Sequence, residues 1–392
     1  MKRGNGFSLI EMLVSIVVLL IVVSTATLML LQAQHATDGV ALMANTQENL
    51  RAGMRFITRD LAQAGEGVPP AGISLPNTAA GVSSVNRPGT ATTFLQPNGV
   101  SYTLLPVVTP GSAIGQPAKS VNPKNNAVLV GVNTDVINIL YADNTLIDAA
   151  GHSLNSYPVV QSAPATPVCA GAINATGLTV TLAPGCFTMP GTPTPISVGN
   201  LILFTNQNGT ALEYVTGVAG QTITFAAGDP AKLNQTGLAN GTVANLKSGG
   251  VFPPTTIQRV WMVTYYIDST TNPSKPQLVR QVNYPNYPTP AAQTNPPQQI
   301  GDCIENLTFS YDITNSTAPV GDYPIGPGDA PQPDPRYDSP AQIRAVNVFL
   351  AGRSEYPYQG SVTPQYFRNN LWTQVSLRSM SFQNQFNTTP IP

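Results

Sequence analysis

The first residues that could carry chemistry lie in the stretch GNGFSLIEML, at positions 4 to 13. Glu11 is the one acidic residue in this stretch, and a long uncharged run follows it. A carboxylate is unfavourable among apolar residues unless a cation or hydrogen-bond donors pair with it. Cleavage between Gly6 and Phe7 would create an ammonium group at Phe7, four residues before Glu11. After such a cut the carboxylate and the new ammonium would be available to pair, within one chain or between neighbouring chains.

A second interpretation assigns Glu11 to the start of a helix. Ser8 and Glu11 fit the S-x-x-E pattern of a capping box, in which each side chain accepts a hydrogen bond from the other residue's backbone amide. The carboxylate would then lie at the edge of a membrane, where a charge costs less than at its centre. The sequence leaves both interpretations open.

The uncharged run has the length of a membrane span. Met12 to Leu31 is a stretch of twenty residues without a charge, and a helix needs roughly 20 apolar residues to cross a bilayer. Lys2 and Arg3 precede it, which predicts a cytoplasmic N-terminus with the rest of the chain outside. A cleaved secretory signal would have a shorter apolar region and an A-x-A site. A simple uncleaved anchor is the other alternative, and neither accounts for Glu11.

The stretch GFSLIEML resembles the processing site of type IV pilins and of the related pseudopilins of type II secretion. The resemblance implies removal of residues 1–6 by a prepilin peptidase that cuts after Gly6, and N-methylation of Phe7. It also implies that Glu11 pairs with the N-terminal amine of an adjacent subunit during assembly. The implied partners are the inner membrane and other minor and major pilins, reached through the N-terminal helix.

The helical pattern continues beyond the span. We expect a transmembrane helix over 7–31 and its amphipathic continuation over 32–65, together roughly 85 Å long at 1.5 Å per residue. Gly65 and Gly67 mark the end of the helix. Charged residues, Arg59 and Asp60 among them, define the polar side. The apolar stripe follows helical spacing and comprises Val40, Met43, Leu50, Met54, Ile57, Leu61 and Ala64.

The rest of the chain is typical of an antiparallel β domain. Short β-branched and aromatic runs recur between turn residues. The predicted fold class is α+β: a long N-terminal helix packed on a large β-rich globular domain. We expect a linker and irregular segment over 66–126, and a β-rich extracytoplasmic domain over 127–392 with Pro-rich loops at 283–299 and 318–342. The predicted strands lie at 91–97, 127–132, 136–142, 178–183, 201–206, 211–218, 221–227, 259–268, 277–283, 304–313, 343–352 and 372–382.

The order of these pieces resembles one pilin group in particular. "NLRAGMRFITRDLAQAG", "RVWMVTYYID", "CIENLTFSYDI" and "IRAVNVFLAGRSE" follow one another as in PilW-type minor pilins. This resemblance implies a structural protein that primes or caps assembly of a bacterial type IV pilus at the cell surface. The J-type minor pseudopilins of type II secretion are a neighbouring group, which the length of the chain disfavours. A surface adhesin or ligand-binding module carried on a pilin stalk is the alternative of a different class.

Charge and cysteine content limit the remaining functions. Only 9% of the 392 residues are charged and the formal net charge is −1, so no basic excess exists to bind nucleic acid. Cys169 and Cys186 flank the strand-like run LTVTL, and an exported protein is expected to join them in a disulfide worth about 3 kcal/mol. The alternative is two small buried side chains. Cys303 is left over and is expected to be buried. No CxxC spacing predicts a zinc site.

Residues for catalysis are scarce. The only histidines are His35 and His152, and no H-E-x-x-H, G-x-S-x-G or P-loop motif occurs. We therefore expect no enzyme activity, no cofactor and no metal site. Four aspartates share one Pro-rich loop and could offer oxygens to calcium, although a solvated loop is the preferred interpretation. They are Asp322, Asp329, Asp334 and Asp338.

Overall fold

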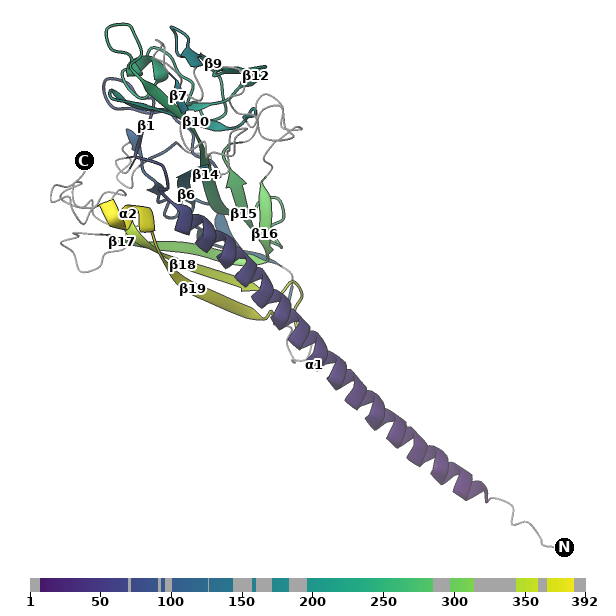
Figure 1. Ribbon diagram of the computed structural model, residues 1–392. Helices are drawn as coiled ribbons and strands as arrows, with labels where there is room; N and C mark the ends of the chain where they lie inside the picture. Colours follow the sequence, from purple (N-terminus) through teal and green to yellow (C-terminus); the bar gives the residue numbers. More distant parts are fainter. Residues whose placement is uncertain are drawn as a thin grey trace.

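A long helix and a β-rich body make up the molecule. The computed structural model describes residues 8–69, 72–90, 93–95, 101–125, 127–143, 157–159, 171–182, 196–284, 297–313, 343–358 and 365–383. Helix α1 (Leu9–Gln63) forms a stalk whose last turns enter the body, and the short helix α2 (Arg378–Gln383) follows the final strand (Figure 1). All pairings between the described strands are antiparallel. The predicted α+β class is confirmed.

The larger sheet is built around one strand, β14 (Thr255–Asp268). Its fourteen residues are rich in β-branched and aromatic side chains and none is exposed, which suits a strand packed on both faces. On one side β14 pairs with β10 and then β15, and on the other with β7 and then β6. The sheet comprises β3 (Val108–Thr109), β6 (Ile137–Ala142), β7 (Tyr157–Val159), β10 (Leu201–Asn206), β11 (Gly209–Tyr214), β14, β15 (Gln277–Val282) and β16 (Gln298–Asp302).

One buried asparagine fills the gap between β10 and β15 along β14. The Met262 amide donates to the Asn283 side-chain oxygen at 3.0 Å, and the Asn283 amide donates to the Met262 carbonyl at 2.7 Å. Asn283 adopts a left-handed φ of 57°, which Asn tolerates better than most residues. The backbone N–H and C=O groups of β14 are therefore hydrogen-bonded at the point where its partner changes from β10 to β15.

Four smaller sheets complete the described body. Strands β17, β18 and β19 lie along α1 in Figure 1, whereas β9 and β12 lie at the end farthest from the N-terminus. The sheets are β17 (Ile304–Ile313), β18 (Ile343–Arg353) and β19 (Arg368–Ser376); β8 (Gly171–Ile173), β9 (Thr179–Leu182), β12 (Gly217–Ala219) and β13 (Thr222–Thr224); β1 (Ile73–Ser74) and β2 (Leu104–Leu105); and β4 (Pro117–Val121) and β5 (Val128–Asn133). A 3-10 helix, η1, spans Val243–Leu246.

The main core lies where α1 meets the sheets. Leu50, Ile57 and Leu61 of α1 are fully buried there among side chains of β6, β14, β15, β17 and β18. The stripe extends less far toward the N-terminus than predicted, because Val40 and Met43 remain 67% and 41% exposed. A second hydrophobic cluster lies at the end of the body that contains β9 and β12. In it, Phe204 and Phe225 pack edge to face with ring centroids 5.5 Å apart.

The segment 66–126, expected as a linker, is irregular in path but contributes to the core. Val85, Phe94 and Leu105 are at most 1% exposed. Arg87 is buried and donates to the side-chain oxygen of Asn138 at 2.6 Å. It also donates to the carbonyls of Thr109, Pro110 and Val136 at 2.8, 2.8 and 3.2 Å. Burial lowers the Arg87 pKa to about 10, so the side chain stays charged and ties this segment to β6.

Several predicted strand limits differ from the structure. The run 372–382 is not one strand, because β19 ends at Ser376 and α2 follows. The run 211–218 divides between β11 and β12. Strand β16 begins at Gln298, inside the predicted loop 283–299. The predicted loop 318–342, with its four aspartates, lies outside the described residues, as do His152, Cys169 and Cys186.

Candidate assembly site

The start of α1 places Glu11 against its own backbone. Ser8 precedes the helix with extended φ and ψ of −69° and 140°. Its amide donates to the Glu11 carboxylate at 3.0 Å, and the Glu11 amide donates to the Ser8 carbonyl at 3.0 Å. The helix-capping interpretation of Glu11 is therefore realised in this chain. Gly6 and Phe7 lie outside the described residues, so pairing with the new amine stays a prediction.

The Ser8 bond does not use up the acceptor capacity of Glu11. A carboxylate has two oxygens and about four lone-pair sites, and the Ser8 amide contacts one oxygen. Both residues are exposed. Glu11 can therefore cap its own helix and accept a cation at its other oxygen.

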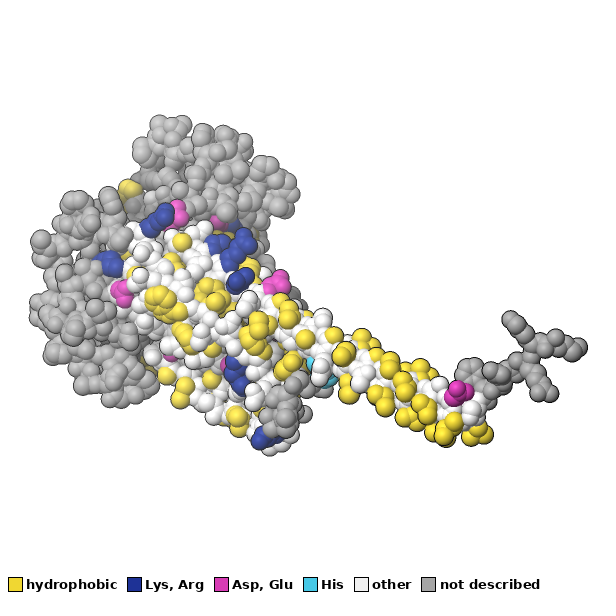
Figure 2. All heavy atoms as spheres, turned by 90° about the horizontal axis from the view of Figure 1, so that it is seen from below, with side chains coloured by type: hydrophobic (Ala, Val, Ile, Leu, Met, Phe, Trp, Pro, Cys, Tyr) yellow, Lys and Arg dark blue, Asp and Glu magenta, His cyan; other side chains and the backbone are white. Residues whose placement is uncertain are grey.

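The first half of α1 is an apolar surface with no partner in the monomer. Large apolar side chains from Leu9 to Leu31 are between 45% and 82% exposed, and they cover the stalk in Figure 2. By length and composition α1 is sufficient to cross a membrane, and it is the one helix among the described residues that meets this test. Membrane anchoring through this helix accounts for its exposed apolar surface.

The few polar side chains of this span are satisfied within the helix. Ser15 donates to the Glu11 carbonyl at 2.7 Å, Ser24 to the Leu20 carbonyl at 2.7 Å, and Thr27 to the Val23 carbonyl at 2.6 Å. Lipid offers no hydrogen bonds, so hydroxyls in a span must find partners inside the protein. These residues therefore do not oppose insertion.

A buried ion pair joins the other end of α1 to the body. Asp60 is fully buried, although its place in the sequence suggested the polar side of the helix. Its carboxylate accepts from the Tyr265 hydroxyl at 2.6 Å and from Arg280 at 2.6 Å. Burial and the neighbouring Asp60 carboxylate raise the Tyr265 pKa, which keeps the hydroxyl protonated as a donor. In the sequence, the only indication of this pair is Arg280, a single charged residue within the strand QLVRQV.

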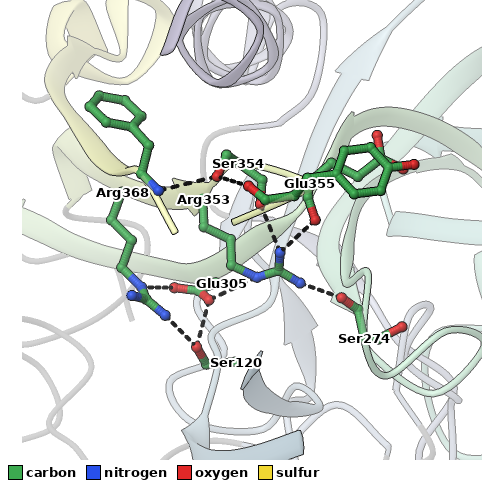
Figure 3. A network of polar contacts seen from close by, with 9 residues as sticks. Ser120, Ser274, Glu305, Arg353, Ser354, Glu355 and Arg368 are labelled. Atoms are coloured by element: carbon green, nitrogen blue, oxygen red, sulfur yellow. Dashed lines mark hydrogen bonds and ion pairs between the residues drawn. The ribbon is translucent and has the colours of Figure 1, made fainter. Parts of the chain in front are cut away.

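The point where α1 leaves the body carries a second polar network. Glu305 of β17 accepts from Arg368 at 3.0 Å, pairs with Arg353 at 3.2 Å, and accepts from Ser120 at 2.7 Å. Figure 3 shows these side chains converging from β4, β17, β18 and β19. Arg353 lines a cavity together with Asn45 and Asn49 of α1. The network therefore braces the sheets next to the helix exit.

A glycine marks the same exit. A Cβ on Gly39 would lie 2.8 Å from the ring of Tyr358. Since real Cβ atoms do not approach so closely, the tyrosine can lie against the helix only because residue 39 has no side chain. The stalk is in contact with the body here, six residues before Asn45.

Comparison with known families decides the nature of the N-terminus. Residues 1–27 match the family described as the prokaryotic N-terminal methylation motif. The match covers the leader, Gly6, Phe7, Glu11 and most of the apolar span. It supports a type IV pilin-like prepilin, with prepilin-peptidase processing and a pilin assembly context. Comparison with curated proteins and with solved structures yields no match.

The methylation motif belongs to structural proteins rather than enzymes. In the described part of the chain, His, Cys, Asp and Glu side chains do not form a cluster of three that could hold a metal ion. Cys303 is a buried free thiol whose pKa burial raises. It follows β16 with a left-handed φ of 56°. Burial matches the expectation for this cysteine.

Proposed function

We propose that this chain is a minor pilin that primes or caps assembly of a bacterial type IV pilus. The observation that carries the proposal is the methylation motif at the head of a helix whose apolar half lacks a partner in the monomer. After removal of residues 1–6, the new amine at Phe7 pairs with Glu11, and the helix joins a bundle of pilin helices. The N-terminus starts in the cytoplasm and the β domain lies in the periplasm before reaching the cell surface.

The size of the body supports a place at the filament end. Packed helices lie about 8–10 Å apart, whereas a body of some 300 residues has a radius of gyration of about 20 Å. A subunit at the filament tip has neighbouring subunits on one side only, which leaves room for such a large domain. Together with the resemblance to PilW-type proteins, this favours a minor pilin. A J-type minor pseudopilin would use the same helix in a secretion pseudopilus.

N-terminal mass spectrometry of the protein from its own cells tests this proposal. We expect a mature chain that begins at an N-methylated Phe7. The Gly6→Ala variant, in which the residue before the cut is changed, is expected to keep residues 1–6. An unprocessed wild-type chain, or normal processing of Gly6→Ala, would overturn the assigned cut site.

Two Glu11 variants separate pairing from capping. Glu11→Val removes both functions, whereas Glu11→Gln keeps an oxygen for the Ser8 amide and loses the charge. We expect both variants to insert in the membrane and both to be at least tenfold depleted from sheared pili, as expected for loss of a charge pair worth about 1.4 kcal/mol or more. Quantitative immunoblotting of pilus and membrane fractions measures this. Wild-type incorporation of Glu11→Gln would show that capping alone suffices.

A further inference from the structure

Strand β5 is an apolar strand that the body leaves uncovered. All six of its residues, VLVGVN, are exposed, whereas all six of β6, INILYA, are buried. Leu129 is 52% exposed, Val130 67% and Val132 79%. Single exposed apolar residues are ordinary, but several in one strand mark an interaction surface.

One edge of β5 is also free in the described structure. The strand pairs with β4, with Leu129 opposite Ser120 and Val130 opposite Lys119, and β4 and β5 form a sheet of two strands. Proteins protect free strand edges with charges, prolines or bulges. β5 contains no charge and no proline, so nothing in its own sequence discourages another strand from pairing with it.

The free edge argues for a protein partner rather than lipid. Unpaired backbone N–H and C=O groups are costly in hydrocarbon, and lipid cannot satisfy them. A neighbouring strand satisfies them in register and covers the apolar side chains at the same time. Because β5 offers no counter-charge, an uncharged strand fits it best, since a buried unpaired charge would be unfavourable.

The hairpin lies beside the exit of α1. Ser120 accepts from Arg368 at 2.9 Å and donates to Glu305 at 2.7 Å, within the network of Figure 3. Lys119 donates to the Ser269 carbonyl at 2.7 Å. The apolar hairpin is thus continuous with the end of the body from which the exposed helix emerges. Pilins that pack on this helix bring their own domains to the same end.

We propose that β5 is a strand-addition site for a neighbouring pilin subunit. An uncharged edge strand of the neighbour's β domain pairs with β5 while the two N-terminal helices pack together. This inference rests on the proposed pilin function, and it assigns a domain–domain contact in addition to the contact between helices.

Photo-crosslinking in cells tests the site on the full-length chain. Benzoylphenylalanine replaces Val132, which is 79% exposed, in one variant and, as control, Val251, which is 58% exposed, in another. We expect the Val132 probe to yield an adduct whose partner, identified by peptide mass spectrometry, is a different protein with an N-methylated pilin N-terminus. Adducts to lipid, to a second copy of this chain or to non-pilin proteins, or no excess over the Val251 probe, would overturn the proposal.

Two matched double variants measure the contribution of the strand. Val130→Lys with Val132→Lys places charges on the edge, and Val130→Thr with Val132→Thr keeps the β-branched shape. We expect the lysine pair to lower recovery of the chain in pili about tenfold and the threonine pair to change it less than threefold. Equal recovery of the lysine pair and wild type would reject the site. If the wild-type chain is N-methylated at Phe7 and present in pili, equal recovery of the lysine pair rejects only the strand-addition site at β5. If the wild-type chain is unmethylated and absent from pili, the pilin function itself is rejected.

Discussion

At the scale of single residues, the body is held together by polar groups buried with their partners. Asp60 with Tyr265 and Arg280, and Arg87 with three carbonyls, each connect segments far apart in the sequence. Such groups are favourable only while every partner is present, because an unpaired buried charge is costly. Removing one partner of such a group should therefore lower the free energy of unfolding more than removing an exposed charge does.

The Asp60 pair gives a direct test of this view. Asp60→Asn keeps the volume but leaves Arg280 without its counter-charge, so we expect unfolding to become easier by about 3 kcal/mol. Arg59, whose side chain is 54% exposed beside Asp60, is the control, and Arg59→Ala should cost less than about 1 kcal/mol. Urea unfolding of the full chain in detergent measures both. A wild-type midpoint for Asp60→Asn would contradict the assignment.

Glu213 predicts a pH dependence of stability. Burial, with a smaller contribution from Asp229, raises its pKa well above the ordinary 4.5. The folded protein then holds a proton that the unfolded chain releases, so its contribution to stability falls as pH rises above about 4.5. Burial raises the pKa of Asp135 and Asp229 as well, which adds to the same trend.

Glu213→Gln removes this ionisation and keeps an acceptor for the Val243 amide, which lies 3.3 Å away. We expect the variant to be more stable than wild type at pH 8 and equal to it at pH 4. Thermal unfolding at the two pH values measures the difference. If Glu213→Gln and wild type differ in unfolding temperature by the same amount at both pH values, Glu213 is not the titrating group.

At the scale of elements, α1 is one continuous helix whose first half is exposed and whose second half packs against the β-rich body. Its first half is apolar and exposed, and from Thr46 onward one side is buried in the body. The change occurs without a break in the helix, although Gly39 and Gly53 lie within it. Both glycines occur where another part of the chain approaches closely rather than where the helix bends.

Gly53 tests this packing role. A Cβ there would lie 2.7 Å from a methyl group of Leu278 and 3.2 Å from one of Leu350. Alanine favours a helix by about 1 kcal/mol over glycine, but overpacking costs about 1–3 kcal/mol. We expect Gly53→Ala to destabilise the body by about 1 kcal/mol. Arg55→Ala on the exposed side should stay within about 0.5 kcal/mol of wild type. A more stable Gly53→Ala protein would contradict the close contact.

At the scale of the whole molecule, the N-terminal helix and the far end of the body have separate cores. The far cluster surrounds β8, β9 and β13 and does not share buried residues with the main core. Gly171 of β8 pairs with Leu182 of β9, so the chain enters and leaves this hairpin at one end. In the sequence Cys169 precedes Gly171 and Cys186 follows Leu182, and both cysteines lie outside the described residues, so their disulfide stays a prediction.

Thiol labelling of the intact protein tests the cysteine assignment. Under non-reducing conditions we expect no cysteine to react with iodoacetamide in the folded chain and one, Cys303, to react after unfolding. Reduction before unfolding should release two more. Peptide mass spectrometry locates each label. Three reactive thiols without reduction would show that Cys169 and Cys186 are not joined.

The sequence alone determined the features that depend on local spacing. The methylation motif of residues 1–27, the position of Glu11 at the start of the helix, the apolar span and most strands of the body follow from residue order within single segments. Those signals are local because helix periodicity, strand alternation and membrane length are properties of one segment.

Only the tertiary structure decided which polar and apolar residues are buried. Asp60 has the local pattern of an exposed helix residue, and it is buried because Tyr265 and Arg280 come from distant strands. Strands β5 and β6 are similar apolar runs, yet one is exposed and the other buried. Burial depends on what packs against a segment, and that is set by contacts between parts of the chain far apart in sequence.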